Sequence, residues 1–239
     1  MYPGVYCTEH IVFLVLTALC IAAGLFLVRR YAKTEKAQTV VIRASAAFLL
    51  FWIALNRTAV TCAQIASDPA HYSWINLIPY TFCGLASTVY SISVLIRPKD
   101  NPLYHFISYF GCFGGTITMF YPDFLETQTF WDIRSFSGLM HHALLVWLTL
   151  LLLSTKHFRP DLKKIWIYPL GYCAVMTLGV FEDEVLGFIH PMNIGAPLLS
   201  AAPVLTSWYV IFVVSTAVAV VISLVFTLKS SPKGGRNPS

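Results

Sequence analysis

Residues Ile11–Val28 read IVFLVLTALCIAAGLFLV, an apolar stretch that contains no charged side chain. A transmembrane helix needs about 20 mostly apolar residues to cross the hydrocarbon core of a bilayer. No Lys or Arg precedes this stretch, and Arg29, Arg30, Lys33 and Lys36 follow it. Because a cleavable signal peptide has its positive charges before the apolar run, we expect a retained first span whose amino-terminal end lies outside the cytoplasm.

The composition extends this interpretation to the whole chain. Of the 239 residues 57% are hydrophobic and 11% are charged, whereas a soluble domain has about 25% charged residues. This excess of apolar side chains excludes an ordinary water-soluble fold. Six further stretches predict spans, at Thr39–Leu55, Ile75–Ile96, Leu103–Tyr121, Gly138–Ser154, Ile165–Phe181 and Ser207–Leu228. We expect an all-α polytopic bundle of seven transmembrane helices, with a single domain over residues 1–229 and a disordered basic cytoplasmic tail at 230–239.

The distribution of charge between the loops predicts the orientation of the bundle. Thirteen of the 16 Lys and Arg residues fall in the first, third and fifth loops and the carboxyl-terminal tail. Eight of the 11 acidic residues fall on the other side, together with Arg57 and Arg134. Since cytoplasmic loops are enriched in Lys and Arg, the amino terminus is predicted outside and the carboxyl terminus in the cytoplasm. We expect a multi-pass protein of the plasma membrane, and its net charge of +5 gives no indication of nucleic-acid binding.

Cysteine and glycine spacing adds two expectations. The six cysteines include no CxxC pair and no metal-ligand spacing, so we predict no metal site and no cofactor. Gly111 and Gly115 form a GxxxG motif in the fourth predicted span. This motif favours close packing of that helix against a neighbour.

Polar side chains in or beside the spans are candidates for function, because burying them in lipid is costly. One cysteine lies about nine residues into the third predicted span, and two adjacent histidines lie near the outer end of the fifth. The second and fourth spans are predicted to end outside in polar residues, and an asparagine precedes the last span. We expect one cavity in the outer half of the membrane, lined by Asn56, Cys83, Asp123, His141 or His142, and Asn193.

These residue types are the components of a thioester mechanism. A thiol needs a base to become the reactive thiolate, and an imidazole needs a carboxylate or amide to orient it. Cys83, His142 or His141, and Asp123 supply those groups. Simpler interpretations stay open: a cysteine often only packs within a helix, one histidine can bond a neighbouring helix, Asp123 can cap a helix, and Glu182–Glu184 can form a solvated acidic edge.

Three segments resemble the YwaF-like integral membrane proteins: IPYTFCGLAS at Ile78–Ser87, YFGCFGGTITMFYPDF at Tyr109–Phe124 and FSGLMHHALLV at Phe136–Val146. Members of that family have a proline-led motif that ends in cysteine, a glycine-containing helix that closes in Pro-Asp, and a helix that opens with histidine. The segment MNIGAPL at Met192–Leu198 resembles their Asn-containing segment before the last helix. The resemblance extends from about Trp74 to the end of the last predicted span.

The resemblance implies acyl transfer, because relatives in animals are described as acyltransferases that place acyl chains on phospholipids by means of a cysteine. Thr81 stands where the family usually has a histidine, and Gly84 stands where it often has a polar residue. The positions that match the motifs are Pro79, Cys83, Asp123, His142 or His141, and Asn193. Contacts to the lipid substrate are expected from Asn56, Pro79, Thr81 and Asn193.

The sequence therefore predicts a membrane acyltransferase, or an acyl hydrolase with the same residues, that acts on a phospholipid in the outer half of the bilayer. Its expected partner is the membrane lipid substrate, and the sequence does not identify a protein partner. The alternative is a lipid-binding, sensing or partner-subunit protein without chemistry. A small transporter is a third reading, although no inverted repeat and no pair of broken helices supports it.

Overall fold

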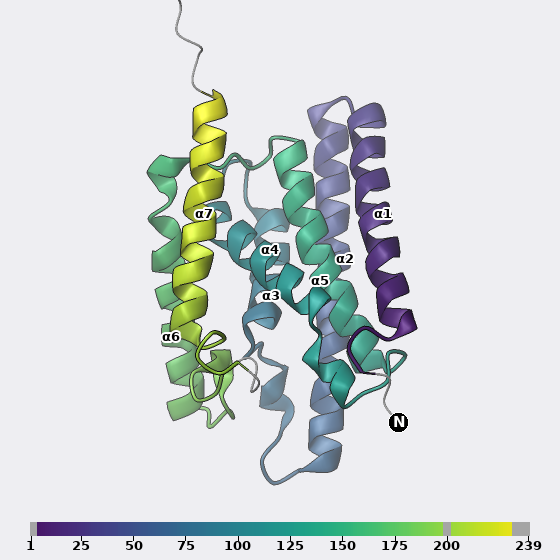
Figure 1. The fold of residues 1–239 in the computed structure, drawn as a ribbon, viewed down its shortest axis with the longest axis vertical. Coiled ribbons are helices and arrows are strands. Elements are labelled where there is room, and N and C mark those ends of the chain that lie inside the picture. Colours follow the sequence, from purple (N-terminus) through teal and green to yellow (C-terminus); the bar gives the residue numbers. More distant parts are fainter. Residues whose placement is uncertain (1–3, 198–201, 231–239) are drawn as a thin grey trace, which may run out of the picture.

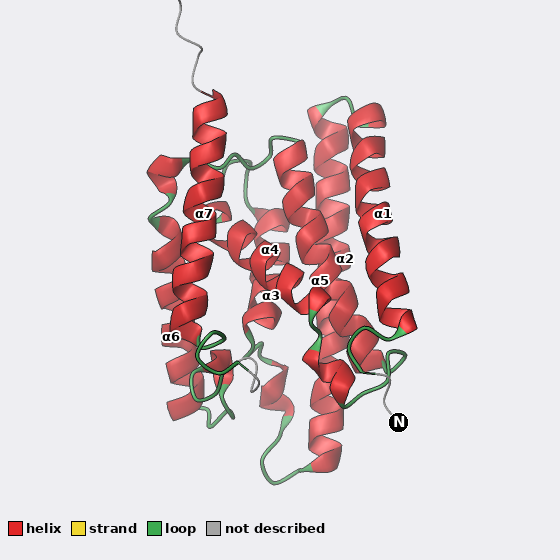
Figure 2. Ribbon diagram, viewed as in Figure 1, coloured by secondary structure: helices red, strands yellow, loops and turns green. Residues whose placement is uncertain are grey.

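The computed structural model describes residues 4–197 and 202–230, and within them the chain forms a bundle of seven α-helices (Figures 1 and 2). Short 3-10 helices occupy several connections. The α-helices are α1 (Thr8–Tyr31), α2 (Glu35–Ser67), α3 (Phe82–Ile96), α4 (Tyr104–Phe120), α5 (Ile133–Ser154), α6 (Ile167–Glu184) and α7 (Trp208–Ser230). The 3-10 helices are η1 (Trp74–Leu77), η2 (Asp123–Glu126), η3 (Leu162–Lys164) and η4 (Pro191–Asn193). The basic tail predicted beyond Ser230 lies outside the described residues.

Among the described residues, five helical segments are long and apolar enough to cross a membrane. They are α1, α2, α5, α7 and the segment Leu162–Glu184, which contains η3 and α6. The most apolar windows of α1 and α7 reach mean hydropathies of 2.9 and 2.7. With 15 and 17 residues, α3 and α4 are shorter. The prediction of an all-α, polytopic membrane protein is confirmed.

Helix α5 lies at the centre of the bundle. It packs mainly against α2 and α4, and α3 packs between those two neighbours. Helix α6 packs on α4, and α7 packs on both α6 and α4. The spanning window of α5 is 67% buried, compared with 6% for α1. Helix α1 is therefore the outlying helix, at the edge of the bundle beside α2 and α5 (Figure 1).

The GxxxG motif lies where α4 crosses α5. A Cβ atom at Gly115 would lie 2.9 Å from the carbonyl oxygen of His142 and 3.2 Å from Cβ of Leu145. A Cβ atom at Gly111 would lie 3.0 Å from a Leu145 methyl group. The predicted close packing is confirmed, and it brings the α4 backbone against the turn of α5 that carries the two histidines.

The third predicted span, Ile75–Ile96, is broken in the structure. η1 ends at Leu77, Ile78 is extended, and α3 begins only at Phe82. The cause is Pro79, which lacks a backbone N–H and disfavours helical geometry at the residue before it. Cys83 is therefore the second residue of α3 and does not lie about nine residues into a continuous helix.

Helix α2 runs to Ser67, well past the end predicted at Asn56–Arg57. Its 33 residues make a helix about 50 Å long, which exceeds the roughly 30 Å hydrocarbon core. The apolar stretch ends at Leu55, but the following residues include no Gly or Pro, so the backbone stays helical. The helix also keeps one buried face throughout, formed by Ile42, Ala46, Leu49, Ile53, Arg57 and Thr61.

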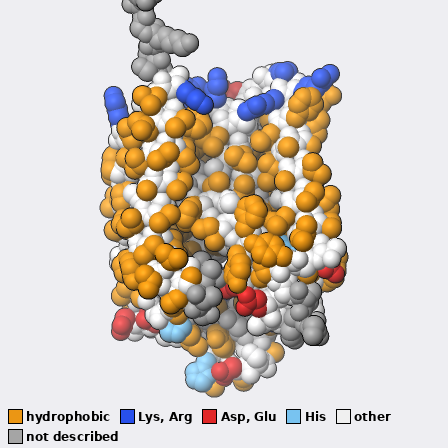
Figure 3. Space-filling view, viewed as in Figure 1, with side chains coloured by type: hydrophobic (Ala, Val, Ile, Leu, Met, Phe, Trp, Pro, Cys, Tyr) orange, Lys and Arg blue, Asp and Glu red, His pale blue; other side chains and the backbone are white. Residues whose placement is uncertain are grey.

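The surface divides into three zones along the bundle axis. Lys and Arg side chains gather at the end where α7 finishes, and Asp, Glu and His side chains gather at the opposite end (Figure 3). Hydrophobic side chains cover the face between them. This is the surface of a protein surrounded by lipid at its middle and by water at both ends.

Candidate functional site

Cys83 lies at the amino-terminal end of α3, where the helix dipole favours a negative charge. Its Sγ lies 3.9 Å from the hydroxyl oxygen of Thr118 on α4. A Cβ atom at Gly114 would lie 3.2 Å from the same sulfur. The thiol therefore sits between α3 and α4, opposite a glycine that leaves room for it.

The Cys83 side chain lines an apolar cavity of about 60 Å³. The other walls come from α4, α6 and α7, and they include Tyr168, Tyr172 and Ser215. None of the other five side chains expected in one cavity lines this space. In the structure α3 begins at Phe82 after the break at Pro79, and Cys83 faces α6 and α7, whereas the histidines lie where α5 packs against α3 and α4. One cavity shared by all these residues stays a prediction.

His141 and His142 form a buried pair whose ring centroids lie 4.0 Å apart. His141 Nδ1 lies 3.0 Å from Ser87 Oγ, one helical turn along α3 from Cys83. His142 Nδ1 donates to the Gly138 carbonyl oxygen at 2.6 Å, and its Nε2 has no hydrogen-bond partner within the described residues. Since Nδ1 carries the proton in that bond, Nε2 is the basic nitrogen of His142.

Asn56 ties α2 to the first turn of α5. Its Nδ2 donates to the Arg134 carbonyl oxygen at 2.9 Å and to Ser137 Oγ at 3.1 Å. A Cβ atom at Gly138 would lie 3.6 Å from Asn56 Nδ2, which is an ordinary contact distance, so this contact does not depend on glycine there. Asn56 therefore makes a helix-to-helix contact, and its predicted contact with lipid stays a prediction.

Asp123 starts η2 directly after Pro122 at the end of α4. The side chain is exposed at the surface, yet the surrounding protein atoms remove part of its water and raise the pKa of its carboxyl, and nearby Glu126 raises it further. Across residues 4–197 and 202–230 no hydrogen bond joins Asp123 to Cys83 or to either histidine. Its role in orienting a histidine stays a prediction.

The segment that begins at Met192 and contains Asn193 packs beside the turn that precedes α3. Met192 N donates to the Tyr80 carbonyl oxygen at 2.8 Å, and a Cβ atom at Gly179 of α6 would lie 2.8 Å from Met192 Cγ. Asn193 itself has a left-handed backbone with φ of 53°. Leu198, at the end of the predicted segment, lies outside the described residues.

Thr81 and Gly84, the two departures from the YwaF-like motif, form a tight cap on α3. Thr81 Oγ1 accepts a hydrogen bond from Gly84 N at 3.2 Å. A Cβ atom at residue 84 would lie 2.8 Å from that oxygen and 3.5 Å from Cβ of Pro79. Local packing therefore favours glycine at this position, because any side chain would clash with Thr81 and open the cap beside Cys83.

Arg57 lies beneath this cap and was counted in the sequence only as an outer-loop charge. The side chain is 6% exposed, donates from Nη2 to the Asn76 carbonyl oxygen, and places Cζ 4.5 Å from the centre of the Tyr80 ring. Its Nε has no partner in the part of the chain that the structure describes. Its spacing of four residues from Ile53 and from Thr61 on the buried face of α2 was the signal for its burial.

Glu182 is the second buried charge that sequence reasoning missed. It is fully buried, and neither carboxyl oxygen has a hydrogen-bond partner among the described side chains and backbone. The guanidinium of Arg57 acts on it electrostatically. The predicted solvated edge is wrong for Glu182 and holds for Asp183 and Glu184, which are exposed. The signal was the buried stripe of α6, formed by Tyr168, Tyr172, Val175, Gly179 and Glu182.

The described residues include no group of three or more His, Cys, Asp or Glu side chains that could hold a metal ion. The candidate side chains supply a thiol, two imidazoles, a carboxyl and hydroxyl groups. Cys83 has a helix amino terminus and a hydroxyl beside it, and the His142 ring has a basic nitrogen with no hydrogen-bond partner among the described residues.

Comparison with protein families gives one match, which covers almost the whole chain. A model of the TMEM164 family matches residues 5–228. No curated protein and no solved structure matches the chain. The matched range includes α1 to α6, α7 as far as Leu228, and every candidate residue described above. The chain therefore belongs to the TMEM164 family of membrane proteins.

Proposed function

We propose that this protein is a membrane acyltransferase that moves an acyl chain between phospholipids, with Cys83 as the acyl acceptor. The observation that carries the proposal is the position of the thiol, at a helix amino terminus and on the wall of an apolar cavity within the bundle. An apolar wall suits an acyl chain, and a helix amino terminus favours the thiolate. The resemblance of its motifs to YwaF-like proteins supports the same activity.

The proposed reaction has two half-reactions. In the first, the sulfur attacks the ester carbonyl of a donor phospholipid, so the carbon–sulfur bond forms and the ester carbon–oxygen bond breaks. The thiol proton passes through a histidine to the departing hydroxyl of the lysophospholipid. In the second, the hydroxyl of an acceptor lysophospholipid attacks the thioester carbonyl, so the new ester carbon–oxygen bond forms and the carbon–sulfur bond breaks. The proton of that hydroxyl passes through the histidine to the departing sulfur. Water as the acceptor makes the same site an acyl hydrolase.

His142 is the proposed base, because its Nε2 is the unpartnered basic nitrogen of the pair. His141 is held against Ser87 and is proposed to fix the position of the neighbouring ring. Asp123 is proposed to orient the base when lipid is bound, and Pro79, Thr81, Asn56 and Asn193 are proposed contacts for the lipid. Hydrogen bonds of a catalytic site often shorten only when substrate binds.

The direct test is acyl labelling of the purified protein in lipid nanodiscs. The protein is incubated with a phospholipid that carries a radiolabelled acyl chain and is then treated with hydroxylamine, which cleaves thioesters. We expect hydroxylamine-sensitive label on the wild type and on Cys112→Ala, and none on Cys83→Ala. Cys112 is the matched control because it is also partly buried and lies outside the cavity. Equal label on Cys83→Ala, or none on the wild type, would contradict the proposal.

All seven helices are proposed to cross the plasma membrane, with the basic end of the bundle in the cytoplasm. The separation of charges between the two ends supports this orientation (Figure 3). Native Cys62 is exposed near the end of α2, on the side proposed to be outside. A membrane-impermeant maleimide is expected to label Cys62 on intact cells and to label Lys36→Cys only after permeabilisation. The reverse pattern would overturn the orientation, and label at neither site on intact cells would overturn the plasma-membrane location.

A lipid-binding protein without chemistry is the second candidate. The observation that favours it is that, within the described residues, no hydrogen bond joins Cys83 to either histidine. The only polar contact of the thiol among these residues is with Thr118. Under this function Cys83→Ala would bind phospholipid as the wild type does, and neither protein would carry the label.

A further inference from the structure

A long groove separates α1 from the rest of the bundle. It lies between α1 and α5, with Phe48 of α2 at its side, and has a volume of about 770 Å³. Ligand pockets usually measure roughly 300–1,000 Å³. The groove shares no lining residue with the cavity at Cys83, so it is a separate site that does not depend on the function proposed above.

The groove exists because α1 is held near its two ends. His10 Nε2 is hydrogen-bonded to the Met119 carbonyl oxygen at 2.8 Å, and Gly24 lies against the ring of Trp147, which a Cβ atom would approach to 2.8 Å. The only buried residues of α1 are His10 and Val28, near opposite ends of the helix. The groove opens along one side of α1, while Leu14 and Ile21 of the same helix pack against the cluster of Met119, Ala143 and Val146.

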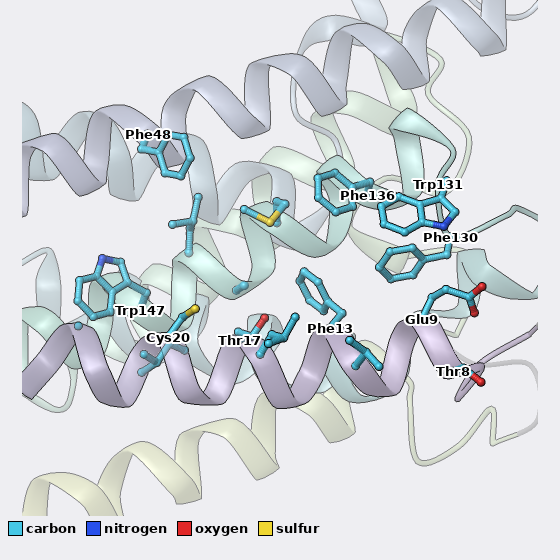
Figure 4. Close-up of a pocket in the computed structure, with 17 residues that line it drawn as sticks. Thr8, Glu9, Phe13, Thr17, Cys20, Phe48, Phe130, Trp131, Phe136 and Trp147 are labelled. Carbon is cyan, nitrogen blue, oxygen red and sulfur yellow. The ribbon is translucent and has the colours of Figure 1, made fainter.

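The two ends of the groove differ in chemistry. Figure 4 places Glu9, Phe130 and Trp131 at one end and Trp147 toward the other. Trp147 is fixed there by a hydrogen bond of 2.9 Å from its Nε1 to Ser45 Oγ. Glu9 is the only charged residue among the lining side chains. The groove thus has a polar mouth and an apolar floor.

We propose that this groove binds one acyl chain of a zwitterionic phospholipid from the leaflet on the acidic side of the bundle. From Glu9 to Gly24 the helix rises about 22 Å, which exceeds half of the roughly 30 Å hydrocarbon core. An extended chain with its headgroup at Glu9 therefore reaches the Trp147 floor. Water does not fill an apolar space of this size well. If the groove were empty, its lining side chains would lose dispersion contacts, which an acyl chain restores.

The mouth selects the headgroup by charge. The Glu9 carboxylate attracts the ammonium of a choline or ethanolamine headgroup, and the exposed Trp131 ring presents a face on which a quaternary ammonium can lie. Acidic side chains gather at this end of the bundle (Figure 3), so they repel headgroups with a net negative charge. The groove should therefore take phosphatidylcholine in preference to phosphatidylglycerol.

The test uses phosphatidylcholine with a photoactivatable diazirine near the end of one acyl chain. The protein is reconstituted in nanodiscs, irradiated, digested and mapped by mass spectrometry. We expect the crosslinks to concentrate on the facing segments 17–24 and 140–147, well above those on the lipid-exposed face of α7. Thr17→Trp fills the groove and should reduce this labelling several-fold. Leu19→Trp, on an exposed face of α1 outside the groove, should leave it unchanged.

A second variant tests the headgroup without changing the groove volume. Glu9→Lys should reverse the preference, so that unlabelled phosphatidylglycerol competes with the probe better than unlabelled phosphatidylcholine. Labelling spread evenly over α1 and α7, or equal in Thr17→Trp and Leu19→Trp, would overturn the proposal. So would displacement of the probe by a sterol alone, or a crosslinked dimer through α1, because each assigns the groove to a different occupant.

Discussion

Ser87 Oγ lies 3.0 Å from His141 Nδ1, and both side chains are buried where α3 meets α5. This pair has the spacing of a nucleophile and its base, although Ser87 lines neither of the two cavities described above. Its position one turn from Cys83 makes it the link between the cysteine helix and the histidine helix. The structural and chemical roles of the pair can be separated by mutation.

Ser87→Ala is expected to lower the free energy of unfolding by about 1 kcal/mol, because it leaves a buried imidazole nitrogen without its partner. The thioester label on Cys83 should persist, since the thiol is unchanged. Thermal unfolding in nanodiscs and the hydroxylamine assay measure the two effects on one sample. Ser91→Ala is the matched control, because Ser91 bonds only the Ser87 carbonyl oxygen within its own helix. Loss of all label in Ser87→Ala, with the protein folded, would show that the chemistry of Cys83 needs the contact between Ser87 and His141.

Gly115→Ala is expected to destabilise the bundle by about 1–3 kcal/mol, the usual cost of overpacking. The added Cβ would meet the His142 carbonyl oxygen at 2.9 Å, and this backbone atom cannot rotate away. Gly114→Ala is the matched variant, because its Cβ would meet only Cys83 Sγ, at 3.2 Å. We expect Gly114→Ala to unfold near the wild-type temperature and to lose thioester label. Equal stability of the two variants would show that α4 does not depend on this contact with α5.

The membrane class and the helix positions could be predicted from the sequence because both follow from long-range averages of hydropathy. Each of the seven apolar stretches overlaps one α-helix of the structure. The ends of a helix differ from the predicted ends where the apolar stretch and the helical backbone do not stop at the same residue. At Asn56 the apolar stretch stops but the helix continues to Ser67. At Pro79 the apolar stretch continues but the helix stops, because proline removes a backbone donor.

The arrangement of the site could not be predicted, because it depends on which face each helix turns inward. A one-residue change in where α3 begins rotates Cys83 by about 100° around the helix axis. The expectation of a continuous third span therefore did not indicate that Cys83 faces α6 and α7. Burial of Arg57 was accessible from its spacing with Ile53 and Thr61, but hydropathy alone assigned Arg57 to a loop.

Asp132 is expected to stabilise α5 in a pH-dependent manner. It caps the helix by accepting from Arg134 N at 2.9 Å, and hydrogen bonds from the Arg134 guanidinium, at 2.8 Å and 2.6 Å, hold the pKa of the carboxyl below its ordinary value of 3.8. A carboxyl whose pKa is lowered by folding stabilises the fold above its unfolded pKa, and this contribution is lost as the pH falls through the folded pKa. The stabilisation is therefore complete at neutral pH and disappears in acid.

Asp132→Ala should lower the free energy of unfolding at pH 7 by about 1 kcal/mol, a typical value for loss of a helix cap. Asp132→Asn keeps a capping oxygen and should lose only the charged pair, so its difference from the wild type should shrink as the pH falls below about 4. Thermal unfolding in nanodiscs between pH 7 and pH 3 measures both. Asp183→Asn, at an exposed position, is the control. If the free energies of unfolding of the wild type and Asp132→Asn differed by the same amount at every pH, the ion pair would be excluded as the cause of the stabilisation.

Glu182→Gln and Glu182→Leu are expected to fold at least as stably as the wild type. Burial of a carboxyl whose oxygens have no partner among the described residues is costly, and an apolar side chain of similar size removes that cost. Thermal unfolding measures the change, with Glu184→Gln as the control at an exposed position. Destabilisation of Glu182→Leu by more than about 2 kcal/mol would show that Arg57 needs this charge, because removing one partner of a buried pair leaves the other uncompensated. Loss of thioester label at unchanged stability would place Glu182 in the chemistry of Cys83.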